Sequence, residues 1–249
     1  MADKLFGNTE DELLMPSGFF DVEDKVWNPL PYNELKYTSE KVVKRLYSLG
    51  RTISKVFSDF NLHYWAHAGT TLGVLRHKGL IPWDDDLDIC VLEKYEDILV
   101  GDIRKVLETE HEIKMMERYY GYVLFHKTES EEFEEFEEFK EMRYPYLDVF
   151  IMRTMLDGNT IMSRSARCRA KWPKEWYEMS DVLSSSSRPF ADFQLSVCNN
   201  PEKYLSNFYG DDWTTIGITQ EFCHVTGRGM HPRSFKMNAE KYLPAYPFR

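Results

Sequence analysis

Apolar side chains recur at steps of three and four along residues 38–60, a spacing that predicts an amphipathic helix. The stripe consists of Val42, Leu46, Leu49, Ile53, Val56 and Phe60. Thr38 or Ser39 can cap the start of this helix, because a hydroxyl oxygen there can accept a hydrogen bond from a free backbone N–H. Residues 62–66 then form a short apolar run that we expect to be a strand.

Short strands and helices continue to alternate through most of the remaining chain. We expect a short helix over 70–76, a loop over 79–84, a strand over 86–92, a helix from 95, a hairpin of 112–117 with 120–126, strands over 144–152 and 188–197, and a helix over 200–209. The serine run 184–187 and the residues after Gly210 are expected to be loops. This order predicts an α+β (mixed α/β) fold, in which helices flank a mixed central sheet and the C-terminal half is irregular.

The predicted strand 86–92 starts with two aspartates that alternate with apolar residues. Successive side chains of a strand point to opposite faces, so Asp86 and Asp88 share one face while Leu87 and Ile89 face a core. Two neighbouring carboxylates repel each other unless something positive joins them, and a divalent metal is the simplest such partner. We therefore predict a Mg²⁺ or Mn²⁺ site at these two aspartates, because such cations prefer hard oxygen ligands.

A third carboxylate lies in the predicted strand 144–152. Asp148 has mostly apolar neighbours in sequence, and a buried charge is costly unless it is paired or metal-bound. It could complete the metal shell or accept a proton from an attacking hydroxyl. Of the other acidic residues beside the first strand, Asp84 is expected to be a weaker metal ligand and Asp85 to point to the opposite face.

A glycine turn precedes the two aspartates and is a candidate phosphate site. Gly69 lets the backbone approach a phosphate closely, and Thr70 with the amides that follow can donate to phosphate oxygens. Three basic residues come next, Arg76, His77 and Lys78. Arg76 is the best bidentate phosphate ligand of the three, because the guanidinium group is planar and always charged.

Composition narrows the class of protein. The chain has 249 residues, is 43% hydrophobic and carries a formal charge of −10, so it can bury a core and does not resemble a general nucleic-acid binder. Its four cysteines include no C-x-x-C pair, which argues against a zinc finger and favours a reducing compartment. The sequence shows no signal peptide and no run of about 18 apolar residues, so we expect a soluble, cytoplasmic protein.

Two charged segments are not assigned to the predicted metal and phosphate site. Residues 129–141 place three phenylalanines among glutamates, which favours an insertion helix or acidic loop on the body of the protein; a partner-docking segment is the alternative. The basic cluster 164–171 contains Arg164, Arg167 and Arg169, which fit a solvated face better than a substrate site.

Single features of the predicted site also have simpler interpretations. A lone D-x-D is common on protein surfaces, and His67 and His77 are more often structural than catalytic in such positions. The combination is more specific than its parts. A G-T turn after a strand, a D-x-D strand and a third carboxylate on a later strand follow the order of nucleotidyltransferase-type sites.

Three stretches together also resemble a known family. The first reads G-T-T-L-G-V-L-R-H-K-G-L-I-P-W-D-D-D-L-D and is similar to the LicD/fukutin-related signature, G-T-L-L-G-x-x-R followed by I-P-W-D-D-D-x-D, with Thr71 where leucine is usual. The second, Y-L-D-V-F around Asp148, resembles the third-carboxylate strand of that family. The third, residues 199–213, resembles its C-terminal segment through Pro201, Leu205 and Tyr209-Gly210.

The resemblance implies a nucleotidyltransferase-like core and transfer of a phospho-alcohol group. Members pass phosphocholine or ribitol phosphate from a CDP-linked donor to a sugar hydroxyl and release CMP. Asp86 and Asp88 fall on the metal-binding aspartates, Asp148 on the third, and Asp84 on another acidic position of the motif. We expect an N-terminal arm over 1–35, a catalytic domain over 36–213 with 129–141 inserted, and a C-terminal extension over 214–249.

Two other functions remain open at this point. A glycosyltransferase also uses a D-x-D and a metal with a UDP- or GDP-sugar donor, and the released nucleotide would distinguish it from a phospho-alcohol transferase. An inactive scaffold that docks a partner through 129–141 would show no metal-dependent nucleotide binding. In the two enzyme hypotheses, the partners are a nucleotide-diphospho donor and a carbohydrate acceptor.

Overall fold

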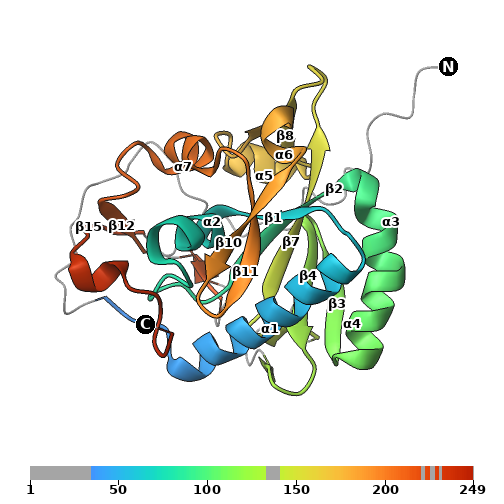
Figure 1. Cartoon of the computed structure of the whole chain (residues 1–249), viewed down its shortest axis with the longest axis horizontal. Helices are drawn as coiled ribbons and strands as arrows, with labels where there is room; N and C mark the ends of the chain where they lie inside the picture. The colour runs from blue at the N-terminus through green and yellow to red at the C-terminus, as the bar shows by residue number, and fades with distance from the viewer. Residues whose placement is uncertain (1–34, 133–140, 220–221, 225–227, 230–231, 249) are drawn as a thin grey trace.

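The computed structural model describes residues 35–132, 141–219, 222–224, 228–229 and 232–248 (Figure 1). Nearly all of the predicted N-terminal arm and the centre of the acidic segment 129–141 lie outside the described residues. The described helices are α1 Glu40–Asp59, α2 Ala68–Leu72, α3 Glu96–Ile98, α4 Arg104–Glu110, α5 Ala166–Lys171, α6 Met179–Val182 and α7 Pro201–Tyr209. The π-helical turns Gly73–His77 and Leu99–Ile103 extend α2 and join α3 to α4, and Glu93–Tyr95 and Ala239–Tyr242 are 3₁₀ turns.

A mixed seven-stranded sheet forms the centre of the molecule, as predicted. Its strands are β1 Tyr64–Ala66, β2 Leu87–Leu92, β3 Ile113–Arg118, β4 Gly121–His126, β7 Leu147–Thr154, β8 Thr160–Ser163 and β9 Tyr177–Glu178. The main order is β1-β2-β7-β4-β3, while β8 pairs with the far end of β7 and β9 pairs with β8. Strands β2 and β7 are parallel, and the other neighbours are antiparallel.

Helix α1 covers one face of this sheet, with α3 and α4 beside it (Figure 1). The predicted amphipathic helix is confirmed, and the side chain of Ser39 caps it by accepting a hydrogen bond from the backbone N–H of Val42. Leu46, Ile53 and Phe57 are among its fully buried side chains. In the part of the chain that the structure describes, no helix combines the length and the apolar character that a bilayer span requires.

The opposite face of the sheet packs against the second half of the chain. Trp65, Phe150, Tyr177 and Tyr204 belong to this second core cluster, which brings β9 and α7 against the central strands. The predicted helix 200–209 is confirmed as α7, with Pro201 in its first turn.

The prediction of a single strand over 188–197 is wrong, because two strands occupy this region. They are β10 Ser185–Phe190 and β11 Phe193–Cys198, which form an antiparallel hairpin. Ala191 at the turn has a positive φ of 50°, and the expected serine loop lies largely inside β10. Because aromatic residues lie on both sides of the turn, the sequence pattern looked like one continuous strand.

The residues after 213 are also more regular than predicted. β12 Ile216–Ile218 pairs with β15 Ser234–Lys236, and β13 Phe222–Cys223 pairs with β14 Arg228–Gly229. These strands are two or three residues long, too short to show the alternation on which a sequence prediction depends. A further short pair, β5 Glu131–Glu132 with β6 Arg143–Tyr144, flanks the acidic segment.

Candidate active site

Three carboxylates meet at the starts of the two parallel central strands. Asp88 of β2 is the direct register partner of Asp148 of β7, and Asp86 immediately precedes β2. One oxygen from each of these three side chains lies within 4.8 Å of the other two. The sequence predicted this convergence, although it placed Asp86 inside the strand, which begins one residue later.

Burial and mutual repulsion shape the electrostatics of this group. The pKa of Asp88 is raised well above its usual range, first by burial and then by the charges of Asp86 and Asp148. The pKa of Asp148 is raised to about 7, again first by burial and then by Asp86. Three acidic groups this close destabilise one another as anions, and hard oxygen ligands suit a divalent cation. The donor set therefore fits Mg²⁺ or Mn²⁺.

Tyr120 is a site residue that the sequence reading did not identify. Its hydroxyl donates a hydrogen bond of 2.6 Å to Oδ1 of Asp148, and its ring stacks on Phe150 at a centroid distance of 4.8 Å. The ring fixes the hydroxyl, so this bond orients the Asp148 carboxylate. Tyr120 lies just before β4, which pairs with β7, and only the sheet register reveals that it reaches Asp148.

The G-T turn packs directly against the aspartates. The hydroxyl oxygen of Thr70 accepts a hydrogen bond of 2.7 Å from the backbone N–H of Asp88, so the turn and β2 are tied together. A Cβ atom at Gly69 would lie 2.6 Å from Oδ2 of Asp84, so a larger residue there would displace the Asp84 carboxylate. Asp84 thus lies against the turn, beside the group of three.

The three basic residues predicted to bind phosphate make contacts within the protein. Arg76 donates from Nη1 to the carbonyls of Trp213 and Ile216, at 2.6 and 2.9 Å, and burial lowers its pKa to about 10. His77 is only 1% exposed, and burial, then the charge of Arg76, lower its pKa to about 3. Lys78 donates to the carbonyl of Leu75 on the surface. A phosphate role for these residues stays a prediction.

Asp85 does not point away from the site, as the alternation of a strand had suggested. His224 lies between Asp85 and Asp86, with Nδ1 2.5 Å from Oδ1 of Asp85 and Nε2 3.0 Å from Oδ2 of Asp86. Burial alone would lower the pKa of His224, but the two carboxylates raise it well above its usual range. Asp85 precedes β2, so the backbone there does not follow the pleat on which the prediction rested.

His67 is buried behind the turn in a network of polar side chains. Its Nδ1 lies 2.8 Å from the hydroxyl of Tyr177 and 3.3 Å from that of Tyr204, and its Nε2 lies 3.1 Å from Oε1 of Glu175. The Tyr204 hydroxyl also accepts a hydrogen bond from the backbone N–H of Ala68. This network supports the turn from β9 and α7, in agreement with the structural interpretation of His67.

Comparisons with known proteins identify the domain that carries this site. A family model described as LicD/FKTN/FKRP, nucleotidyltransferase domain, matches residues 61–200. An uncharacterised Rickettsia prowazekii protein, RP689, is 41% identical over 180 residues, which cover 72% of this chain and 59% of that protein. The Haemophilus influenzae lipopolysaccharide cholinephosphotransferase LicD is 50% identical over 30 residues, 12% of this chain and 11% of that protein.

Human ribitol 5-phosphate transferase FKRP is 25% identical over 184 residues, which cover 71% of this chain and 33% of FKRP. Among solved structures, ANT(2″)-Ia in complex with adenylyl-2″-tobramycin is similar at 13% identity and a TM-score of 0.38, over 68% of this chain and 78% of that one. The chain thus spans little more than half of RP689 and a third of FKRP. The family match covers the G-T turn and all three convergent carboxylates, and the chain belongs to the LicD/FKTN/FKRP nucleotidyltransferase domain family.

Proposed function

We propose that this protein transfers a phospho-alcohol group, such as phosphocholine or ribitol phosphate, from a CDP-linked donor to a hydroxyl of a glycan. The observation that carries the proposal is the convergence of Asp86, Asp88 and Asp148 at the starts of β2 and β7, inside the family domain. Two relatives support the type of group, since they are named as a cholinephosphotransferase and a ribitol 5-phosphate transferase.

The three convergent carboxylates would hold Mg²⁺ or Mn²⁺. When bound, such a cation supplies positive charge that offsets the diphosphate of the donor and the charge that develops on the leaving group. Asp86 and Asp88 bring their carboxylates from one short stretch, and Asp148 brings the third from the neighbouring parallel strand. The parallel register fixes the distance between the backbones of Asp88 and Asp148.

Asp148 is also suited to accept the acceptor's proton. Its carboxylate lies beside those of Asp86 and Asp88, and Tyr120 holds one of its oxygens in place. The acceptor oxygen attacks the phosphorus that bears the alcohol, its proton moves to Asp148, and the bond to the bridging oxygen breaks. CMP leaves with that oxygen, so atoms and charge balance.

A thermal-unfolding panel tests the choice of donor. CDP-choline, CDP-ribitol, a UDP-sugar and a GDP-sugar are each added with and without Mn²⁺. A ligand at 100 times its Kd stabilises the folded state by roughly 2.7 kcal/mol, which raises the Tm of a chain of this size by roughly 5–10 °C. We expect such a shift with a CDP-alcohol, and only when Mn²⁺ is present.

Asp88→Asn should abolish the Mn²⁺-dependent part of this shift, whereas Asp102→Asn, at an exposed position, should leave it unchanged. A shift with UDP- or GDP-sugars alone would favour the glycosyltransferase and contradict the proposal. The absence of a shift with any nucleotide would favour the scaffold, whose docking segment 129–141 lies largely outside the described residues.

A further inference from the structure

His224 enters the carboxylate site from a part of the chain that lies beyond the matched family domain. Its side chain is 14% exposed, and both of its ring nitrogens face carboxylate oxygens, Nδ1 toward Asp85 and Nε2 toward Asp86. An ionised carboxylate can only accept hydrogen bonds, so the imidazole is the donor in both contacts. Asp86 is therefore shared between His224 on one side and the group formed with Asp88 and Asp148 on the other.

The orientation of this imidazole is fixed by its surroundings. The other oxygen of Asp85, Oδ2, accepts a hydrogen bond of 2.8 Å from the hydroxyl of Tyr144, so Asp85 is held from two sides. The ring of Tyr146 meets the imidazole edge-on, at a centroid distance of 5.7 Å and an interplanar angle of 88°. With Nδ1 bound by Asp85, Nε2 is aimed at Asp86.

The motif stretch itself anchors the segment that carries this histidine. Trp83 donates from its indole nitrogen to the carbonyl of Ile218 at 2.9 Å. Arg76 donates to the carbonyls of Trp213 and Ile216. These bonds hold the chain on the N-terminal side of His224 against the residues that lead into β2, which explains how a distant segment reaches the aspartates.

We propose that His224 is a positioning residue, whose Nε2–H holds the Asp86 carboxylate in the orientation that converges with Asp88 and Asp148. This inference rests on the proposed function, because it assumes that the three carboxylates bind a divalent cation. Asp86 precedes β2 and lies outside its paired positions, so strand pairing does not fix the backbone of Asp86. Without a donor on its far side, repulsion from the other two carboxylates would favour rotation of Asp86 away from them.

Hydrogen-bond partners of metal-binding side chains have measurable effects on metal affinity. Their removal commonly weakens metal binding or activity by about 10- to 100-fold, because the ligand is no longer preoriented. The effect expected here is a loss of Mn²⁺ affinity, with a smaller change in kcat once Mn²⁺ is saturating. Substitution of a residue needed only for folding would change stability, but it would not weaken Mn²⁺ binding more than it changes kcat.

Two amide substitutions separate the two contacts of the imidazole. The amide of asparagine reaches about as far as Nδ1, and that of glutamine about as far as Nε2. His224→Gln can therefore still donate to Asp86, while His224→Asn can donate only to Asp85. We expect His224→Asn to bind Mn²⁺ about tenfold or more weakly than the wild type, and His224→Gln to stay within about threefold of the wild type.

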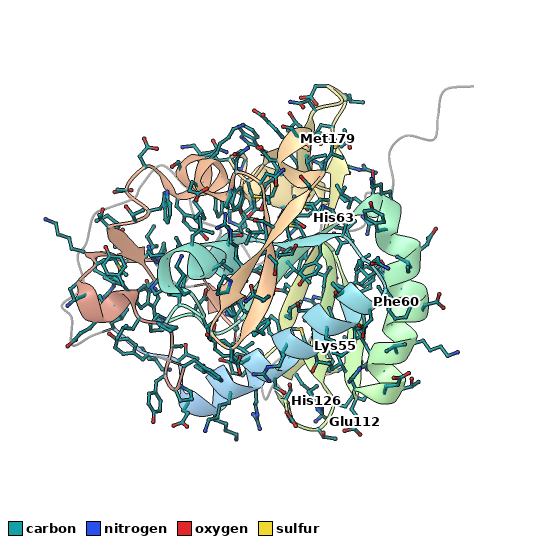
Figure 2. The ribbon with its side chains drawn as sticks, in the orientation of Figure 1. Lys55, Phe60, His63, Glu112, His126 and Met179 are labelled. Carbon is teal, nitrogen blue, oxygen red and sulfur yellow. The ribbon has the colours of Figure 1, made fainter. Side chains whose placement is uncertain are left out.

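Mn²⁺ titration followed by electron paramagnetic resonance measures the affinity directly, without donor or acceptor. His126→Gln is the matched control, since His126 lies next to Glu112 at the bottom of Figure 2 and bonds to the backbone of Glu129. Thermal unfolding of each metal-free variant shows whether it is folded, and Asp88→Asn confirms that the signal reports the carboxylate site.

Equal Mn²⁺ affinity in the asparagine and glutamine variants would overturn the inference. So would tighter binding by His224→Asn, which would mean that the imidazole competes with the cation. Failure of the proposed function would look different. The wild type would then bind Mn²⁺, and the two variants would differ as expected, but no CDP-alcohol would be cleaved.

Discussion

The two faces of the parallel pair β2–β7 differ in composition, although both are formed by the same six pairs of residues. The face under α1 is aliphatic throughout and at most 1% exposed, with Leu87, Ile89, Val91, Leu147, Val149 and Ile151. The other face starts with Asp88 and Asp148 and becomes apolar further along, with Cys90, Leu92, Phe150 and Met152. The pleat therefore separates the residues that stabilise the sheet from those that carry the chemistry.

The largest expected effect comes from the carboxylate face. Asp148→Asn should reduce the rate of donor cleavage by about 10²- to 10⁴-fold, because a general base is lost along with one cation ligand. The metal-free protein should stay folded, since one buried charge is removed. Initial rates of CMP release and thermal unfolding measure the two effects, with Asp102→Asn as the control. Full activity in Asp148→Asn would contradict the assignment.

The aliphatic face should give the opposite result. Leu147→Ala should lower the free energy of unfolding by about 2–5 kcal/mol, because Leu147 is 1% exposed and its truncation leaves a cavity. The rate of CMP release per folded molecule should stay within about threefold of the wild type. Urea unfolding measures the first quantity. A stable but inactive Leu147→Ala would show that the two faces are not separable.

The carboxylate face should also make the stability of the metal-free protein depend on pH. The pKa of Asp148 is about 7 in the folded state and about 3.9 when unfolded, so between these values the folded state binds more protons. The stability of the metal-free protein should therefore fall as pH rises from about 4 to about 7, by at most about 4 kcal/mol from this residue. His224, whose pKa is also raised, should add to the fall as pH rises through its folded pKa.

Urea unfolding at pH 5 and pH 7.5 measures this slope. Asp148→Asn should flatten it, whereas Leu147→Ala should lower stability equally at both pH values. Mn²⁺ should stabilise the wild type more at pH 7.5 than at pH 5, because the carboxylates must lose their protons to bind it. An unchanged slope in Asp148→Asn would show that other groups cause the pH dependence.

The smallest expected effect concerns Arg76. Arg76→Lys should lower the free energy of unfolding by about 1–2 kcal/mol, because the shorter lysine side chain cannot place a donor where Nη1 donates to both Trp213 and Ile216. Hydrogen exchange should become faster in β12. If Arg76 instead binds the donor phosphate, as the sequence predicted, the substitution will raise the KM for the donor and leave β12 protected.

How much of this site the sequence could predict depends on the range of the interactions. Asp86 and Asp88 followed from the alternation within one strand, and Asp148 from a charge inside an apolar run. Both signals are local, and strand pairing then brings the residues together. His224 and Tyr120 carried no such signal, because a histidine in a short irregular segment and a tyrosine before a hairpin strand look like surface residues.

The fold shows the same limit. The amphipathic helix α1 was predictable because its apolar stripe is long and periodic. The β10–β11 hairpin was missed because its two-residue connection at Ala191 contains no glycine, asparagine or proline. Arg76 was assigned to phosphate because arginine suits that role in general, and its binding to backbone carbonyls far along the chain could be known only from tertiary structure.

The most direct test of the proposed reaction is the site of bond cleavage in the donor. The protein is incubated with CDP-choline or CDP-ribitol and Mn²⁺ in ¹⁸O-labelled water, which replaces the glycan as acceptor, and the products are analysed by mass spectrometry. Transfer of the phospho-alcohol group predicts ¹⁸O in phosphocholine or ribitol phosphate and unlabelled CMP, with both products lost in Asp88→Asn. Label in CMP would mean attack on the cytidine-linked phosphorus and would contradict the account.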